Sequence, residues 1–219
     1  GRPAPEHPVR VADGLLTPFV LASASPARLQ TLRRAGVAVF VRVSGVDEES
    51  VTASTTSELV AELARLKAEA VFAELDAGDV AVLGCDSLLE LDGTPCGKPA
   101  SRADAVAAWQ RMRGRTGVLL TGHHLVVRRG ATVDRVTRTA ATKVTFADLD
   151  DAEIDAYVAT GEPDHVAGAF TIDGLGGPYV TRIDGDPHNV IGLSLPLLRE
   201  MLRGLGIAWH DLWEPTPLG

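Results

Sequence analysis

The chain lacks most of the features that identify a protein class at first sight. Its 219 residues include two cysteines, Cys85 and Cys96, which are too few for a disulfide framework and do not have the spacing of a zinc site. No apolar run approaches the roughly 18 residues that a membrane-spanning helix needs. A Gly-x-Ser-x-Gly turn and a Walker-type phosphate loop are also missing. These absences disfavour disulfide-stabilised domains, membrane spans, serine hydrolases and P-loop enzymes.

Cationic residues are scarce as well. The 21 lysines and arginines are outnumbered by 29 aspartates and glutamates, which gives a formal net charge of -8 at pH 7. Non-specific nucleic-acid binding needs a basic face, so we expect no nucleic-acid partner and no membrane partner. A nucleotide pocket, in contrast, needs only a few local cations. The polar, Pro-rich start lacks the layout of a signal peptide, so we expect a cytoplasmic protein.

The hydrophobic pattern is that of a globular α/β protein. With 45% hydrophobic and 23% charged residues, the chain can bury a full core. Two long segments joined by a tight turn at Arg129-Gly130 predict a hairpin, so the sheet should be mixed rather than purely parallel. Ser25, Thr55, Ser101 and Asp150 are predicted helix N-caps. We expect strands at 19–23, 39–43, 80–83, 118–127, 132–146 and 179–183, and helices at 25–34, 55–75, 101–112, 150–160 and 195–203.

The strand at 80–83 is expected to break at Gly84-Cys85-Asp86-Ser87. A carboxylate beside an apolar core costs free energy unless it is paired, capped or metal-bound. Asp86 is therefore either a turn-forming residue or a functional one, acting as a metal ligand or a general base for water. Glu48 lies in an acidic turn, which is commonly only a solvated loop. Together with Asp86 it could hold Mg²⁺ or Mn²⁺, since both ions prefer oxygen ligands.

The turn from Ser23 to Arg28 is a candidate anion site. Small residues after a strand leave backbone N–H groups free to face a ligand, and the helix that follows points its positive end at the same place. Ser23, Ser25 and Arg28 would contribute to it; the alternative is an ordinary capped helix. Lys98, held stiff by a following proline, and Lys67, on the long helix, are candidate phosphate ligands, although most lysines are simply solvated. The histidines share no metal-ligand spacing and are expected to be structural.

Taken together, these segments resemble the Maf family. Each block is weak alone, but the ordered set is specific and spreads over roughly Val20 to Leu202. The blocks are Leu21–Arg28, Val46–Glu48, Leu66–Ala68, Gly84–Ser87, Leu91–Pro99, Gly114–Thr116, Thr121–Gly122, Tyr157–Pro163, Ala167–Phe170, Asp173–Gly174 and Asn189–Leu193.

The resemblance implies a fold shared with the inosine triphosphate pyrophosphatases: an elongated mixed sheet bent between two lobes, with a central cleft. It also implies hydrolysis of a nucleoside triphosphate, normal or modified, at the α–β bond to give the monophosphate and pyrophosphate. Asp86 would activate water, and Glu48 would place a divalent metal with it. Residues that match the family's substrate-binding positions are Ser23, Ser25, Arg28, Lys67, Lys98 and Arg115.

The sequence departs from the better-known subgroups of this family at the positions linked to base choice. These positions read Ala27, Ser87 and Asp173, a combination that fits neither the thymidine and uridine triphosphate subgroup nor the methylated guanosine triphosphate subgroup. An expected Asp-Lys pair is replaced by His165-Val166, so one cation is missing. Asp173 could accept hydrogen bonds from the N–H groups of a base.

The resemblance also sets the expected organisation and the alternatives. We expect residues 1–14 to be disordered or an expression remnant, residues 15–210 to form a single two-lobed Maf-like domain, and residues 211–219 to be a tail. A homodimer is a further expectation. Family members have been associated with arrest of cell division, so the main alternative is a non-catalytic, nucleotide-sensing septum regulator. An inosine triphosphate pyrophosphatase proper is disfavoured, because that group lacks this Ser-Pro-Ala-Arg and Gly-Lys-Pro pairing.

Overall fold

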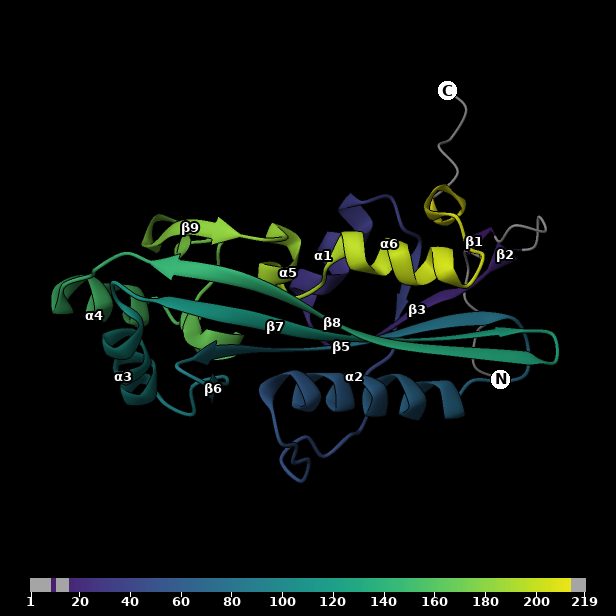
Figure 1. Cartoon of the computed structure of the whole chain (residues 1–219), viewed down its shortest axis with the longest axis horizontal. Helices are drawn as coiled ribbons and strands as arrows, with labels where there is room; N and C mark the ends of the chain where they lie inside the picture. The colour runs from purple at the N-terminus through teal and green to yellow at the C-terminus, as the bar shows by residue number, and fades with distance from the viewer. Residues whose placement is uncertain (1–8, 11–15, 214–219) are drawn as a thin grey trace.

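The computed structural model describes residues 9–10 and 16–213, which form an elongated mixed sheet with helices on both faces (Figure 1). The main sheet has seven strands in the order β4-β3-β5-β7-β8-β9, with β6 paired to β5. A separate two-stranded sheet joins β1 and β2. The strands are β1 (Val9–Arg10), β2 (Leu16–Thr17), β3 (Phe19–Ala22), β4 (Val39–Val41), β5 (Val80–Leu91), β6 (Thr94–Cys96), β7 (Thr116–Arg129), β8 (Thr132–Phe146) and β9 (Val180–Asp184).

The helices begin where the sequence supplies a side-chain cap. Ser25, Thr55, Ser101 and Asp150 each accept a hydrogen bond from a backbone N–H three residues on, so all four predicted N-caps are confirmed. The helices are α1 (Pro26–Arg34), α2 (Thr56–Ala73), α3 (Arg102–Met112), α4 (Asp151–Ala159), α5 (Pro187–Ile191) and α6 (Leu195–Gly204). Short 3₁₀ turns are η1 (Glu162–His165), η2 (Ala167–Ala169), η3 (Gly177–Tyr179) and η4 (Trp209–Leu212).

The sheet combines a short parallel part with a long antiparallel part. Strand β3 runs parallel to both β4 and β5, whereas β5, β7, β8 and β9 are antiparallel neighbours. The β7–β8 hairpin has the turn predicted at Arg129-Gly130. Helix α2 lies along one face of the long strands, and α1, α5 and α6 lie on the other (Figure 1). Helices α3 and α4 cover one end of the sheet.

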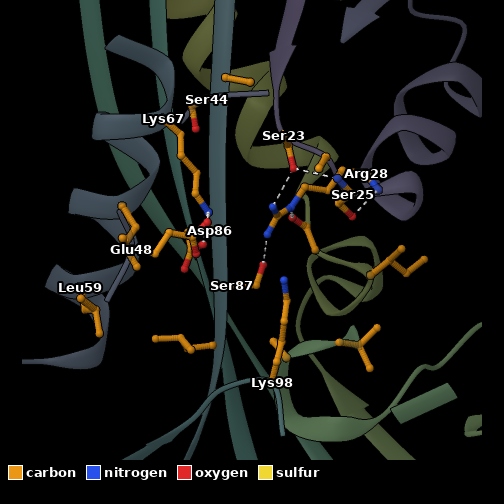
Figure 2. A pocket seen from close by; sticks show the side chains of 18 of the residues that line it. Ser23, Ser25, Arg28, Ser44, Glu48, Leu59, Lys67, Asp86, Ser87 and Lys98 are labelled. Carbon is orange, nitrogen blue, oxygen red and sulfur yellow. Dashed lines mark hydrogen bonds and ion pairs between the residues drawn. The ribbon is translucent and has the colours of Figure 1, made fainter. Parts of the chain in front are cut away.

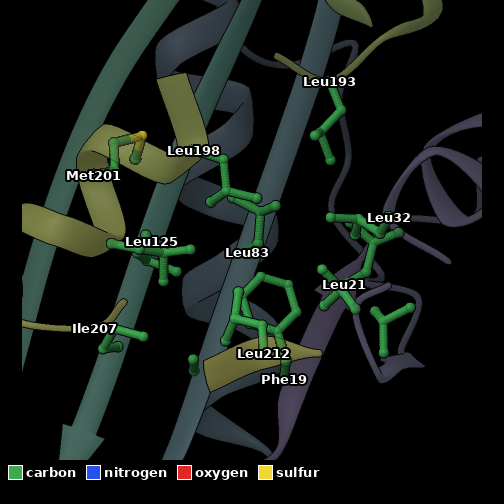
Figure 3. Close-up of a cluster of buried hydrophobic side chains, with 14 of the residues drawn as sticks. Phe19, Leu21, Leu32, Leu83, Leu125, Leu193, Leu198, Met201, Ile207 and Leu212 are labelled. Carbon is green, nitrogen blue, oxygen red and sulfur yellow. The ribbon is translucent and has the colours of Figure 1, made fainter. Parts of the chain in front are cut away.

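The hydrophobic core is divided along the long axis. One cluster lies between the sheet and helices α1 and α6 (Figure 3), and a smaller one lies under α2. A third cluster, built around Trp109, Phe146 and Tyr157, holds α3 and α4 against the far end of the strands. The division into two ends bridged by long strands leaves room for a pocket between them.

One expectation about the sheet is wrong. The strand at 80–83 does not break at Gly84–Ser87; β5 continues through these residues to Leu91. Continuous pairing from Val80 to Glu90 with the long strand β7 imposes extended geometry on residues whose local composition favours a turn. Asp86 is therefore a mid-strand residue, and it lies opposite Gly122.

The expected domain limits stay predictions. Most of the segment predicted as 1–14 lies outside the described residues, and so do residues 214–219 of the expected tail. Within the tail, Leu212 is buried in the cluster formed by α1 and α6. The packed part of the chain thus extends past residue 210.

Candidate active site

The pocket forms where the sheet is interrupted. Strand β3 pairs with β5 only as far as Ala22 and Gly84, and β6 joins β5 again at Leu89. Within the described chain, the intervening stretch of β5, Cys85–Leu88, has β7 as its sole strand neighbour. At this gap β3 turns into helix α1, so an open strand edge and a helix N-terminus meet. Both are places where backbone groups are left for a ligand or a side chain to satisfy.

Three charged side chains meet on the α2 side of this gap (Figure 2). The Lys67 Nζ atom donates to Asp86 Oδ1 at 2.6 Å and lies 2.9 Å from Glu48 Oε1. Lys67 and Asp86 are 8% and 7% exposed, whereas the Glu48 side chain, on the segment between β4 and α2, is half exposed. Burial of an isolated Asp86 carboxylate would be costly, and the lysine offsets that cost. The predicted acidic pair is therefore brought together, with the predicted helix lysine between its members.

Two glycines allow helix α2 to come this close. A Cβ added at Gly84 would lie 2.2 Å from the Ala64 carbonyl oxygen, and one at Gly122 would lie 2.1 Å from that of Val60. Any side chain at either position would push α2 off the sheet. The glycines thus set the helix–strand spacing that places Lys67 on Asp86.

Arg28 lies on the other side of β5, where its guanidinium bonds to the protein itself (Figure 2). Nε donates to the Gly192 carbonyl at 2.7 Å, and one terminal nitrogen donates to Ser23 Oγ at 3.1 Å and to the Cys85 carbonyl at 2.9 Å. The other terminal nitrogen donates to Ser87 Oγ at 2.9 Å. The predicted anion-site arginine is present at the pocket, but most of its donors are already used.

These groups line a single cavity of about 650 Å³ that opens between the two ends of the molecule. That volume suits a small-molecule ligand. Two of the chain's three lysines, Lys67 and Lys98, line it. Of the residues predicted for the site, eight line the cavity: Ser23, Ser25, Arg28, Glu48, Lys67, Asp86, Ser87 and Lys98.

Three predicted residues do not line the cavity. Ala27 lies on the first turn of α1, where its carbonyl accepts a hydrogen bond from Thr31. Arg115 forms an ion pair with Asp92 at the exposed start of β7. Asp173 is exposed on the loop between η2 and η3. The structure thus brings the metal candidates and five of the six phosphate candidates together, but it leaves Arg115 and two of the three base-choice candidates outside the pocket lining.

Some cavity residues carry weak signals in the sequence. Ser44, Glu49 and Val51 come from the segment that carries Glu48, and Val190 and Ile191 come from helix α5. The signal for α5 was present: Asp186 caps it, Pro187 starts it and Gly192, with φ of 119°, ends it. At five residues it is too short for a hydrophobic period to show.

The two carboxylates fit a divalent cation in part. Oxygens of Glu48 and Asp86 already converge on one positive centre, the Lys67 ammonium, so they can share a cation. Mg²⁺ is commonly held by one or two carboxylates, with waters and substrate phosphates at its other positions. No cluster of three or more His, Cys, Asp or Glu residues suited to a metal occurs in the part of the chain that the structure describes. A metal at this site would thus need non-protein oxygens.

Neither the thiol beside Asp86 nor the buried histidines provide a reactive group here. Burial raises the pKa of Cys85 to about 12, so its thiol stays protonated and is a poor nucleophile. Burial lowers the pKa of His123 to about 4, and its ring bonds to the Thr121 carbonyl and to the Ser194 N–H. His124 contacts Thr137 and Glu69 on the α2 face. The site's chemistry therefore falls to carboxylates, lysines and hydroxyls.

Among the described residues, every helix is too short or too polar to span a bilayer.

The chain is similar to known proteins over most of its length. Residues 18–205 match the family described as Maf-like protein. A protein named nucleoside triphosphate pyrophosphatase from Salinispora tropica is 55% identical over 91% of this chain and 91% of its own length. Proteins of the same name from Streptomyces coelicolor and Cutibacterium acnes are 55% and 52% identical and are covered over 95% and 96% of their lengths. The solved Ham1 protein of Staphylococcus aureus is 17% identical, with a TM-score of 0.46, covering 86% of this chain and 100% of that one. The family match spans all the residues that line the pocket, and the chain belongs to the Maf-like protein family.

Proposed function

We propose that this protein is a nucleoside triphosphate pyrophosphatase that cleaves the α–β bond of its substrate to give the monophosphate and pyrophosphate. The observation that carries the proposal is the meeting of Asp86, Glu48 and Lys67 at one wall of the pocket. The names of relatives about half identical over nearly the whole chain support the same reaction.

Asp86 is the general base in this proposal. Its carboxylate is held by Lys67 on a rigid strand, and such fixed geometry is what lets a carboxylate orient and deprotonate a water. Glu48 and Asp86 would hold Mg²⁺ or Mn²⁺, which would supply charge neutralisation for the triphosphate. Because Glu48 lies on a connecting segment rather than a strand, it is the more adaptable of the two ligands.

The triphosphate would be held by groups from both ends of the molecule. Lys67 comes from α2, and Lys98 follows β6 at the opposite end of the cavity (Figure 2). Ser23 and Ser25 stand at the N-terminus of α1, where the helix dipole favours an anion. Phosphoryl transfer depends mainly on positioning and charge neutralisation, which this set supplies. Arg115 could join it only by leaving Asp92.

The base would contact a different part of the pocket. Ser87 is the one base-choice candidate that lines the cavity, and Val166 and Ile191 add apolar surface to the lining. Ala27 and Asp173 could influence base choice only indirectly or through movement of the loop that carries Asp173. We also propose that the protein has no nucleic-acid partner, on the strength of the -8 net charge. The cytoplasmic location stays a prediction. The predicted homodimer stays a prediction.

A substrate panel tests the function. Purified protein is mixed with normal and modified nucleoside triphosphates and Mg²⁺ or Mn²⁺, and products are separated by ion-exchange chromatography. We expect monophosphate and pyrophosphate in equal amounts from at least one substrate. Release of diphosphate and orthophosphate would contradict the α–β assignment. Tight binding of a non-hydrolysable triphosphate without turnover of any substrate would instead favour the nucleotide-sensing regulator.

A further inference from the structure

Arg28 has few hydrogen-bond donors left for a ligand. A guanidinium has five N–H donors. Four are used inside the protein, by the Gly192 carbonyl, Ser23 Oγ, the Cys85 carbonyl and Ser87 Oγ. The residue is only 9% exposed, so the ion is largely taken out of water. A group this fully engaged is built to hold its neighbours in place.

The neighbours that Arg28 holds are the residues on either side of Asp86. The Cys85 carbonyl lies on the open edge of β5, where β3 has already ended, and Arg28 takes the place of the missing strand partner. Ser87 Oγ, one residue after Asp86, receives the other terminal nitrogen. Successive side chains point to opposite faces of a strand, so Ser87 faces Arg28 whereas Asp86 faces Lys67. Arg28 thus holds β5 on the face opposite the one where Lys67 contacts Asp86.

The hydrogen bonds continue across the sheet from Ser87. Its hydroxyl lies 2.9 Å from Thr121 Oγ1 on β7, which in turn donates to the Asn189 carbonyl at 3.4 Å. The Asn189 side chain is fully buried and donates to the Leu119 carbonyl and to Thr142 on β8. Arg28 is thus one end of a largely buried polar chain that reaches three strands.

We propose that Arg28 is a positioning residue for Asp86 rather than a ligand of the triphosphate. This inference rests on the proposed function. The Arg28 guanidinium holds Cys85–Leu88, the stretch of β5 that lacks a strand partner on one edge among the described residues, in the orientation that lets Asp86 reach water. Lys67 and Lys98 neutralise the phosphates. The role needs a planar, forked cation, because a lysine ammonium cannot reach acceptors that lie in four directions.

The test separates binding from turnover in Arg28→Ala and Arg28→Lys. We expect kcat to fall about 100-fold in both, as for a misplaced catalytic group. The affinity for a non-hydrolysable triphosphate, measured by calorimetry, should change less than about threefold, because phosphate contacts are kept. Added free guanidinium should restore part of kcat in Arg28→Ala only. Arg33→Ala, an exposed arginine on the same helix, is the matched control and should match the wild type.

Thr121→Val gives the second line of evidence if the Arg28 variants fold poorly. Thr121 is fully buried and does not line the cavity, and valine keeps its shape while removing its hydroxyl. We expect kcat to fall about tenfold with unchanged affinity, the pattern of a lost orienting contact.

Two results would overturn the inference. Arg28→Ala could weaken triphosphate affinity by tenfold or more while Arg28→Lys keeps it, which is the behaviour of a phosphate ligand. Alternatively, Thr121→Val and Arg28→Ala could leave kcat unchanged. Either result leaves the proposed function standing, because that function fails only if the wild-type protein turns over no triphosphate.

Discussion

The two faces of strand β5 use charge in different ways. On the α2 face, Lys67, Asp86 and Glu48 meet at the pocket wall, and Glu48 stays half exposed. On the α1 face, Arg28 is buried and its donors are tied to backbone carbonyls and hydroxyls. Charges on the first face can be shared with a substrate or a metal, whereas the charge on the second face mainly fixes the strand. Proximity to a pocket therefore does not by itself make a cation a ligand.

Substitution of Gly84, which allows α2 to pack closely on the sheet, should disrupt the contact between Lys67 and Asp86 most strongly. In Gly84→Ala, the new Cβ would lie 2.2 Å from the Ala64 carbonyl oxygen, so α2 must shift and carry Lys67 away from Asp86. We expect kcat to fall about 100-fold or more, and overpacking to destabilise the fold by about 1–3 kcal/mol. Steady-state kinetics and urea unfolding measure the two effects.

The control for that change is Gly204→Ala. No atom lies within 4 Å of a Cβ built there, at the end of α6. Wild-type activity is expected. Full activity in Gly84→Ala would show that helix spacing does not set the site.

Lys67→Met tests whether the ammonium on the first face takes part in the reaction. Removing it leaves Asp86 without its buried partner and the triphosphate without a cation, so we expect kcat to fall about 100-fold. Lys143→Met, at an exposed position on β8, is the matched control, and should keep wild-type kinetics. If both variants behave alike, Lys67 is only a structural counterion.

Glu48→Gln tests the more exposed of the two carboxylates on the α2 face of β5. The amide keeps the size of the side chain but removes its charge. We expect the Mn²⁺ concentration for half-maximal activity to rise about tenfold, with a smaller loss of kcat at saturating metal, as when one of two carboxylate ligands is removed. Glu49→Gln, which also lines the pocket, is the comparison. A larger effect there would move the metal assignment to Glu49.

His123 gives a pH test of the second face. It accepts a hydrogen bond from the Ser194 N–H, and burial lowers its pKa from 6.5 to about 4. His123 takes up a proton below pH 6.5 in the unfolded chain but only near pH 4 in the folded protein. The free energy of unfolding should therefore fall as the pH drops from 6.5 to 4. The total effect is about 3 kcal/mol.

Urea unfolding between pH 7 and 4 measures this slope. His123→Gln should flatten it, whereas His210→Gln, at an exposed position, should leave it unchanged. An equally steep slope in His123→Gln would assign the acid sensitivity to other groups.

Much of the fold follows from local rules in the sequence. Ser25, Thr55, Ser101 and Asp150 cap their helices because each side chain can reach its own helix's N–H groups. The hairpin follows from its turn and its flanking apolar residues. The path of β5 could not be read in this way, since Gly84–Ser87 has turn-forming composition and only pairing with distant β7 keeps it extended.

The site follows the same division. The residue types predicted that Asp86 needs a partner, and the structure supplies Lys67. What local pattern could not show is which donors are already occupied: Arg28 is one residue among six in its turn, yet its acceptors lie up to 164 residues away. The seating of α2 on Gly84 and Gly122 is likewise a contact between distant segments.

The central claim is that Asp86 activates water. Asp86→Asn, measured for kcat and for affinity towards a non-hydrolysable triphosphate, tests it most directly. We predict a loss of kcat of about 1,000-fold at saturating Mg²⁺ or Mn²⁺, with the variant folded and still able to bind the non-hydrolysable triphosphate. A folded Asp86→Asn protein that keeps a tenth or more of the wild-type kcat would contradict the claim.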